Sequence, residues 1–197
     1  MQLLIATTNS GKVREAKDIL ALMGLQIVDL GQFPGAPVPE ETGATFEENA
    51  LIKARHYFRL TGVTTVADDS GLEVDILGGA PGVRSARYAG EGASDNDRIE
   101  RLLRELSGAA QPDRSARFVC AAAIVWPGGE QVFRGEVRGL IATEPAGEGG
   151  FGFDPVFFYP QFGKTFAQLS RAEKSSVSHR GVAFTSLAKW ISQKGLL

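Results

Sequence analysis

The sequence predicts an α/β fold with a mixed β-sheet, because short apolar runs alternate along the chain with segments of helical periodicity. The apolar run at residues 3–6 is followed by a polar stretch and then by apolar residues at three- and four-residue spacing between Val13 and Met23. This order indicates a strand, a loop and a helix. Residues 116–126 and 131–143 flank Pro127-Gly128-Gly129 and predict a long antiparallel hairpin.

The segment before residue 63 contains two further elements. A second strand is expected at residues 26–30. Thr45 and Glu48 have the spacing of a capping box, so a helix should begin there and end near Gly62. Its buried face is predicted to consist of apolar residues at helical spacing, namely Ala50, Leu51, Ala54 and Phe58.

The alternation continues after this helix. Val63–Ala67 is a short, partly β-branched run that predicts a buried strand. Ser94 with Asp97 opens another helix, whose core-facing residues are predicted to be Ile99, Leu102, Leu103 and Leu106. A last helix is expected from about Ser178 to Gln193, with a buried face of Val182, Leu187, Trp190 and Ile191.

The composition is that of a globular chain with almost balanced charge. There are 21 Lys and Arg residues against 23 Asp and Glu residues, a formal net charge of −2, so no basic surface is expected that would coat nucleic acid. The longest apolar stretch, Phe118–Trp126, is about half of a membrane span. Residues 1–12 lack the features of a secretory signal. We therefore expect a cytoplasmic protein with a single domain at residues 1–197 and neither a nucleic-acid nor a membrane partner.

The cysteine and histidine counts exclude two classes of site. One cysteine, Cys120, cannot form an internal disulfide, and together with two histidines it cannot make a Cys/His zinc cluster.

A glycine motif at residues 147–152 fits the pattern G-x-G-x-x-G but fails on its context. In a dinucleotide site this pattern follows the first strand and opens a helix. Here Phe153-Asp154-Pro155 comes next, which cannot begin such a helix. A dinucleotide site is therefore not predicted.

The loop after the first strand has part of the chemistry of a phosphate site. Gly11-Lys12 resembles the end of a P-loop, but Ala6 and Val13 stand where that motif needs Gly and Ser or Thr. A polar loop that enters a helix still offers backbone N–H groups and the positive end of the helix dipole, and Lys12 adds a charge. The alternative is an ordinary helix start that is capped by Asn9 or Ser10.

Asp68-Asp69 follows directly on the predicted strand Val63–Ala67, at a sheet edge where α/β proteins bind ligands. Adjacent carboxylates repel each other and are costly to bury unless a cation or hydrogen-bond donors compensate them. Mg²⁺, which prefers oxygen ligands, is a natural compensator. The alternative is a turn in which one aspartate caps Ser70-Gly71.

Two further segments carry side chains that suit a nucleotide. Phe151-Gly152-Phe153-Asp154-Pro155 places two aromatic rings around a glycine, and such rings can stack on a base, which is worth ~1–3 kcal/mol per base. The alternative is a strand with two core aromatics. Lys174, His179 and Arg180 gather at a predicted helix start, where the dipole disfavours cations, and an anion or a carbonyl-rich ligand at the site would explain this placement. The alternative for His179 alone is a structural histidine. Lys53 is either a surface or a site residue, and Glu40-Glu41 alone says little.

Together these segments resemble the inosine triphosphate pyrophosphatase family, also called the XTP/dITP pyrophosphatases. The matching segments cover nearly the whole chain in order: Ala6–Lys12 with Glu15, Glu41-Thr42-Gly43, Thr45-Phe46, Glu48-Asn49-Ala50, Lys53-Ala54, Ala67–Leu72, Gly78–Gly82, Ser85–Tyr88, Gly149–Phe157 and Lys174–Gly181. Thr8 departs from the glycine of many members, and Phe153 from the tyrosine of some.

The resemblance implies an elongated mixed sheet flanked by helices, with two lobes around a central cleft. It also implies a homodimer and the Mg²⁺-dependent hydrolysis of ITP, dITP and XTP to the monophosphate and pyrophosphate. The substrate-binding residues that it implies are Thr7, Thr8, Asn9, Ser10, Gly11, Lys12, Lys53, Ser70, Phe151, Gly152, Phe153, Asp154, Lys174, His179 and Arg180.

The same resemblance implies roles for the acidic residues. Glu41 and Asp69 would bind the metal, with Asp68 in its outer shell, and Asp69 would be the catalytic residue that orients or deprotonates the attacking water. Lys174, His179 and Arg180 would donate hydrogen bonds to the O6 carbonyl of hypoxanthine or xanthine, whereas the amino group of adenine would face other donors.

Two other functions stay open. One is a related nucleotide pyrophosphatase that acts on a modified pyrimidine triphosphate. The other is a nucleotide-binding regulator without hydrolysis, although Asp68-Asp69 argues against a site that binds anions only.

Overall fold

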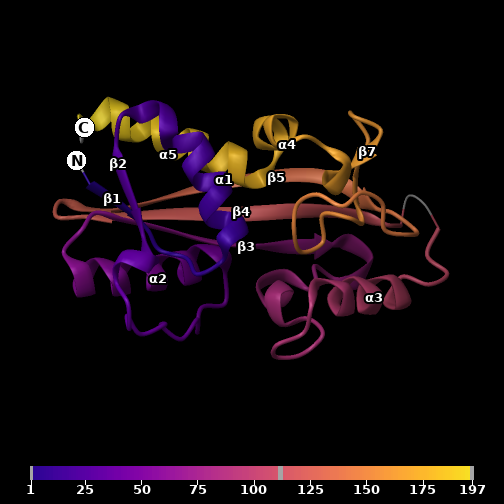
Figure 1. The fold of residues 1–197 in the computed structure, drawn as a ribbon. Helices are drawn as coiled ribbons and strands as arrows, with labels where there is room; N and C mark the ends of the chain where they lie inside the picture. The colour runs from indigo at the N-terminus through magenta and orange to yellow at the C-terminus, as the bar shows by residue number, and fades with distance from the viewer. Residues whose placement is uncertain (1, 111–112, 196–197) are drawn as a thin grey trace. The chain divides into compact units, whose positions relative to one another are not determined.

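The computed structural model describes residues 2–110 and 113–195, which form strands and helices in alternation (Figure 1). The strands are β1 (Gln2–Ile5), β2 (Gln26–Asp29), β3 (Thr65–Val74), β4 (Ser115–Trp126), β5 (Gly129–Ile141), β6 (Phe157–Tyr159) and β7 (Lys164–Thr165). The α-helices are α1 (Ser10–Leu20), α2 (Phe46–Thr61), α3 (Asp95–Glu105), α4 (Arg171–Val177) and α5 (His179–Lys194). Short 3₁₀ helices occur between them, among them one at Gly82–Arg87.

The strands make one mixed sheet with the order β2-β1-β3-β4-β5-β6-β7. β1 is parallel to both β2 and β3, whereas β6 is antiparallel to β5 and to β7. A two-residue connection joins the neighbouring strands β4 and β5, which is the predicted hairpin. The prediction of a mixed sheet flanked by helices is confirmed.

The chain divides into two compact units, and the division falls within β3, β4 and β5. The first unit contains the described residues up to Ser70, residues Cys120–Glu136 and the described residues from Ser178 onward. The second unit contains the described residues of Gly71–Val119 and Val137–Val177. The predicted single folding domain and the predicted central cleft stay predictions.

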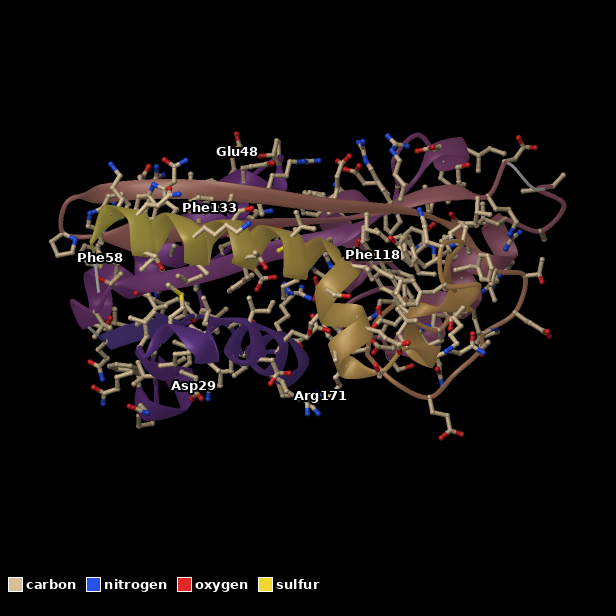
Figure 2. The ribbon with its side chains drawn as sticks, turned by 90° about the horizontal axis from the view of Figure 1, so that it is seen from above. Asp29, Glu48, Phe58, Phe118, Phe133 and Arg171 are labelled. Atoms are coloured by element: carbon tan, nitrogen blue, oxygen red, sulfur yellow. The ribbon has the colours of Figure 1, made fainter. Side chains whose placement is uncertain are left out.

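In the first unit, helices cover both faces of the sheet. α1 and α5 lie next to each other on one face, and α2 lies on the other (Figure 1). Side chains alternate between the faces of a strand, so Leu3, Ile5 and Val66 point into the core beneath α1 and α5. Phe133 of β5 lies beside α5 in Figure 2, and its ring centroid is 5.6 Å from that of Trp190.

In the second unit, α3 packs its buried residues Ile99 and Leu102, together with its C-cap residue Leu106, into a core that is rich in phenylalanine. Arg114 is buried beside this core and donates hydrogen bonds to the carbonyls of Leu106, Ile141 and Ala142, at 2.7–2.9 Å. Burial lowers the pKa of its guanidinium. Arg114 therefore joins the end of α3 to the end of β5.

Several predicted helix ends are confirmed. Asn9 is the N-cap of α1 and accepts a hydrogen bond from the Lys12 amide. The capping boxes of Thr45 with Glu48 and of Ser94 with Asp97 are both formed.

The predicted end of the strand at Ala67 was wrong. β3 continues through Asp68 and Asp69 to Val74, so the two aspartates lie within a strand and not after it. A buried carboxylate in a central strand is costly unless cations or hydrogen-bond donors compensate it, and the residues that do so are described below.

The last predicted helix is confirmed as α5, but the surroundings of Lys174 and the exposure of Val182 differ from the prediction. Lys174 lies in a separate helix, α4, because the Ser178 side chain accepts a hydrogen bond from the Gly181 amide and starts α5 there. Val182, predicted to be buried, is 42% exposed, whereas Leu187 and Ile191 are buried as predicted. The aromatic segment at residues 151–155 forms turns and not a strand.

No helix in the part of the chain that the structure describes is long and apolar enough to cross a membrane.

Gly135 allows the first turn of α5 to lie against β5. A Cβ atom at this position would lie 2.2 Å from the His179 carbonyl oxygen and 2.6 Å from the Ala183 nitrogen. We expect Gly135→Ala to lower the free energy of unfolding by about 1–3 kcal/mol, measured by urea denaturation, because the backbone has to move. The exposed Gln131→Ala on the same strand is the control. Equal stability of the two variants would contradict this packing argument.

Candidate active site

Asp68 and Asp69 point to opposite faces of the sheet, because successive side chains alternate along a strand. Asp68 contacts Lys12 of α1 and Arg180 of α5, on one face. Asp69 contacts Lys53 of α2, on the other face. Each carboxylate therefore has its own set of cations, and both sets lie in the first unit.

The Asp68 cluster is built around a fully buried guanidinium. Arg180 is 1% exposed and donates to Asp68 Oδ2 from Nη2 at 3.0 Å and from Nε at 3.2 Å. It also donates to Glu15 Oε2 at 2.6 Å and to Ser70 Oγ at 2.8 Å. Lys12 Nζ lies 3.2 Å from Asp68 Oδ2.

The charges in this cluster keep Asp68 ionised. Burial by itself would raise the pKa of Asp68, but the charges of Lys12 and Arg180 outweigh it and hold that pKa far below its usual range. In the same way, burial would lower the pKa of Arg180, but the charge of Asp68 raises it. Asp68 therefore acts as a fixed anion that joins α1 and α5 to β3.

The Asp69 cluster gathers two carboxylates around one ammonium group. Lys53 Nζ lies 3.1 Å from Asp69 Oδ1 and 2.9 Å from Glu41 Oε1. Burial raises the pKa of Asp69, and the charges of Lys53 and Lys12 oppose this shift only in part. The pKa of Lys53 is raised, because its acidic neighbours outweigh its burial. Asp69 is therefore a more basic carboxylate than Asp68.

Asn49 is a site residue that the sequence reasoning did not assign a role. It is buried, donates from Nδ2 to Asp69 Oδ2 at 3.4 Å, and accepts the Gly43 N–H on Oδ1 at 2.8 Å. A Cβ at Gly43 would lie 2.7 Å from that same oxygen, so glycine is required there. Asn49 thus connects Asp69 to the segment that carries Glu41. Asn49 lies four residues before Lys53, on the same face of the helix, and this spacing is the feature of the sequence that could have identified it as a site residue.

The loop at residues 7–12 retains the features that suit a phosphate. Its Thr8 and Ser10 are exposed, and the Asn9 N–H donates to Thr7 Oγ1 at 3.2 Å. α1 has no acidic residue in its first turn, so the positive end of its dipole is not offset there. Lys12 lies on this same turn.

The predicted base-stacking segment lies in the second unit. Asp154 Oδ2 accepts the Phe151 N–H at 2.8 Å and the Lys174 ammonium at 2.5 Å. That ammonium lies 4.9 Å from the centroid of the Phe151 ring. Phe153 is buried in the core, whereas Phe151 is partly exposed, so Phe151 is the better candidate for stacking.

The structure thus separates the predicted site residues into two groups. The first unit holds Thr7, Thr8, Asn9, Ser10, Gly11, Lys12, Glu41, Lys53, Asp68, Asp69, Ser70, His179 and Arg180. The second unit holds Phe151, Gly152, Phe153, Asp154 and Lys174. His179 is buried next to Arg180. The donors of Arg180 engage Asp68, Glu15 and Ser70, and its contact with a purine O6 stays a prediction.

Glu41 and Asp69 fit a Mg²⁺ ion. Their oxygens already converge on one cation, the Lys53 ammonium. No group of three or more acidic, histidine or cysteine residues that could hold a metal occurs within residues 2–110 and 113–195. Mg²⁺ commonly takes only one or two carboxylates and completes its shell with waters and substrate phosphates. Asp68 faces the other way, and its place in an outer shell stays a prediction.

The fold and these clusters define the class of protein. The chain belongs to the Ham1 family, whose model matches residues 3–190. It is 50% identical to the dITP/XTP pyrophosphatase of Geobacillus kaustophilus over 187 residues, which cover 94% of this chain and 92% of that protein. It is 48% identical to the dITP/XTP pyrophosphatase of Escherichia coli O157:H7, with 94% and 95% covered.

Solved structures agree with this assignment. A HAM1 protein from Coxiella burnetii superposes with a TM-score of 0.89 at 40% identity, covering 98% of this chain and 99% of that one. The Ham1 protein of Staphylococcus aureus gives a TM-score of 0.87 at 41% identity, with 98% and 100% covered. The resemblance inferred from the sequence is confirmed.

Loss of the buried guanidinium should be costly. We expect Arg180→Met to lower the free energy of unfolding by about 3–5 kcal/mol, because Asp68 loses its main partner inside the protein. Arg134→Met is the matched control: Arg134 forms a partly exposed ion pair with Glu47, and its loss should cost less than about 1 kcal/mol. Urea denaturation of both variants measures the difference, and similar losses would contradict the stabilising role of Arg180.

Proposed function

We propose that this protein hydrolyses dITP, XTP and ITP to the nucleoside monophosphate and pyrophosphate. Its membership in the Ham1 family and the names of its relatives support this reaction. The observation that carries the proposal is the convergence of Glu41 and Asp69 on one cation position, next to the cluster that contains Lys12. Lysine ammonium groups and carboxylates that lie this close together suit the binding of a triphosphate and of its metal counter-ion.

In this proposal Asp69 takes a proton from the attacking water. Its pKa is raised by burial, which makes it a better proton acceptor than an exposed aspartate. The water oxygen forms a bond to the α-phosphorus, and the bond from that phosphorus to the bridging oxygen of the β-phosphate breaks. Pyrophosphate leaves with the electron pair, and Lys12 and Lys53 offset its negative charge.

Mg²⁺ would be held by Glu41 and Asp69, and it would supply neutralisation of the charge that develops on the leaving pyrophosphate. Lys53 holds the two carboxylates together, since its ammonium contacts both. Asn49 fixes Asp69 from α2 and also fixes the segment that carries Glu41. The triphosphate would lie between the loop at residues 7–12 and Lys53.

Selection of the base would rest on donors and on stacking. Hypoxanthine and xanthine carry a carbonyl acceptor at C6, whereas adenine carries an amino donor there. Lys174, His179 and Arg180 would be the donors, so adenine would leave a polar group unpaired, which costs about 1–3 kcal/mol. Phe151 would stack on the ring, and Ser70 with Asp154 would fix the nucleoside.

We expect Asp69→Asn to lower kcat for dITP by about 10²–10⁴-fold, the usual contribution of a positioned base. Pyrophosphate release at saturating Mg²⁺ measures it, and circular dichroism verifies the fold. Asp29→Asn is the control, because Asp29 pairs with Lys17 outside the two aspartate clusters and should keep normal turnover. Near-normal kcat in Asp69→Asn would remove Asp69 from this role.

A substrate panel separates this proposal from its alternatives. We expect pyrophosphate from dITP, XTP and ITP with Mg²⁺, at least tenfold less from ATP, and none with EDTA, because a lost hydrogen bond of about 1.4 kcal/mol gives that factor. Preference for a modified pyrimidine triphosphate would favour a related pyrophosphatase. Binding without pyrophosphate release would favour a regulator.

The homodimer and the cytoplasmic location stay predictions. Sedimentation velocity of the purified protein tests the first, and cell fractionation tests the second.

A further inference from the structure

We infer that Asp95 is a positioning residue for the base-stacking segment at residues 151–154. This inference rests on the proposed function, because it gives that segment its task. Asp95 is the first residue of α3, and its carboxylate Oδ2 accepts the Gly152 N–H at 2.6 Å. The two residues are 57 positions apart in the chain, so this contact is tertiary and not part of a local turn.

Arg98 extends this contact to a third segment. Its Nη2 donates to Asp95 Oδ1 at 2.5 Å, one helical turn along α3. Its Nη1 donates to the Ala86 carbonyl, in the 3₁₀ helix Gly82–Arg87, also at 2.5 Å. Asp95 thus uses both carboxylate oxygens, one for the stacking segment and one for an arginine that is itself fixed.

The stacking segment is held from two sides within the second unit. From α4, Lys174 contacts Asp154, whose carboxylate also accepts the Phe151 amide. From α3, Asp95 holds Gly152, whose φ of +63° lies in the left-handed region. Phe151 directly precedes Gly152, and its own amide is bonded to Asp154. Each contact restricts the conformation of the segment before a base binds. Less conformational entropy is therefore lost when the Phe151 ring stacks on the base.

Asp95 should affect the binding of the base and not the binding of the triphosphate. Asp95 acts through the segment and not on the reacting phosphorus, so its loss should weaken the binding of the base alone. Stacking on a ring contributes equally to the ground state and to the transition state. A change of this kind raises KM and leaves kcat nearly unchanged.

The test compares Asp95→Ala with the wild type. We expect KM for dITP to rise by about 3- to 10-fold, the range for one lost hydrogen bond, with kcat changed less than twofold. The inhibition constant of inorganic tripolyphosphate, which has no base, should stay unchanged. Asp95→Asn should restore KM in part, because its carboxamide oxygen can still accept the Gly152 N–H, whereas its amide nitrogen cannot accept from Arg98.

Asp97→Ala is the matched control. Asp97 lies in the same first turn of α3 and accepts from the Ser94 amide at 2.7 Å and from the Ser94 hydroxyl at 2.6 Å. Its loss weakens the start of the helix but leaves the contact to Gly152. An equal rise of KM in this control would overturn the inference, and so would a rise of the tripolyphosphate constant that matches the rise of KM.

Amide hydrogen exchange at Gly152 gives a readout that needs no substrate. Exchange should be faster in Asp95→Ala and unchanged in Asp97→Ala. Unchanged exchange in both variants would overturn the inference that Asp95 holds Gly152. If the wild type releases no pyrophosphate from dITP, the proposed function fails, while the exchange result still decides whether Asp95 holds the segment.

Discussion

Two adjacent carboxylates inside the sheet have to be neutralised, and much of the first unit depends on how this is done. Asp68 is 3% exposed and Asp69 is 6% exposed. Burying such a pair without partners would cost several kcal/mol per ion. Arg180 and Lys12 approach from one face of the sheet and Lys53 from the other. The same ion pairs therefore stabilise β3 and fix three helices at the place where the chemistry is proposed.

The two aspartates differ in function because their surroundings differ. The paired cations around Asp68 outweigh its burial and lower its pKa, whereas burial prevails at Asp69 and raises its pKa. One group is thus a fixed anion, and its neighbour in the chain is a stronger base. Active sites commonly separate the pKa values of neighbouring groups in this way. Here the separation results from the alternation of side chains along one strand.

In the second unit, carboxylates that form ion pairs and accept hydrogen bonds hold the base-stacking segment in place. A single carboxylate, Asp154, turns the stacking segment back on itself and accepts a buried ammonium, that of Lys174. Asp95 accepts a hydrogen bond from the Gly152 amide of the same segment. Rigid supports of this kind reduce the entropy that binding costs. The loop that carries the aromatic ring is consequently held by α3 and by α4, not by its own backbone alone.

The sequence by itself determined the local features: the capping boxes at Thr45 and Ser94, the hairpin and the family to which the chain belongs. These depend on neighbours a few residues apart or on motifs that can be compared directly. Only the tertiary structure decided that β3 continues through the aspartates and that Arg180 is buried against Asp68, 112 residues away in the chain. Charge compensation over such a separation leaves no periodic pattern, because the energy of an ion pair depends on distance in space and not along the chain.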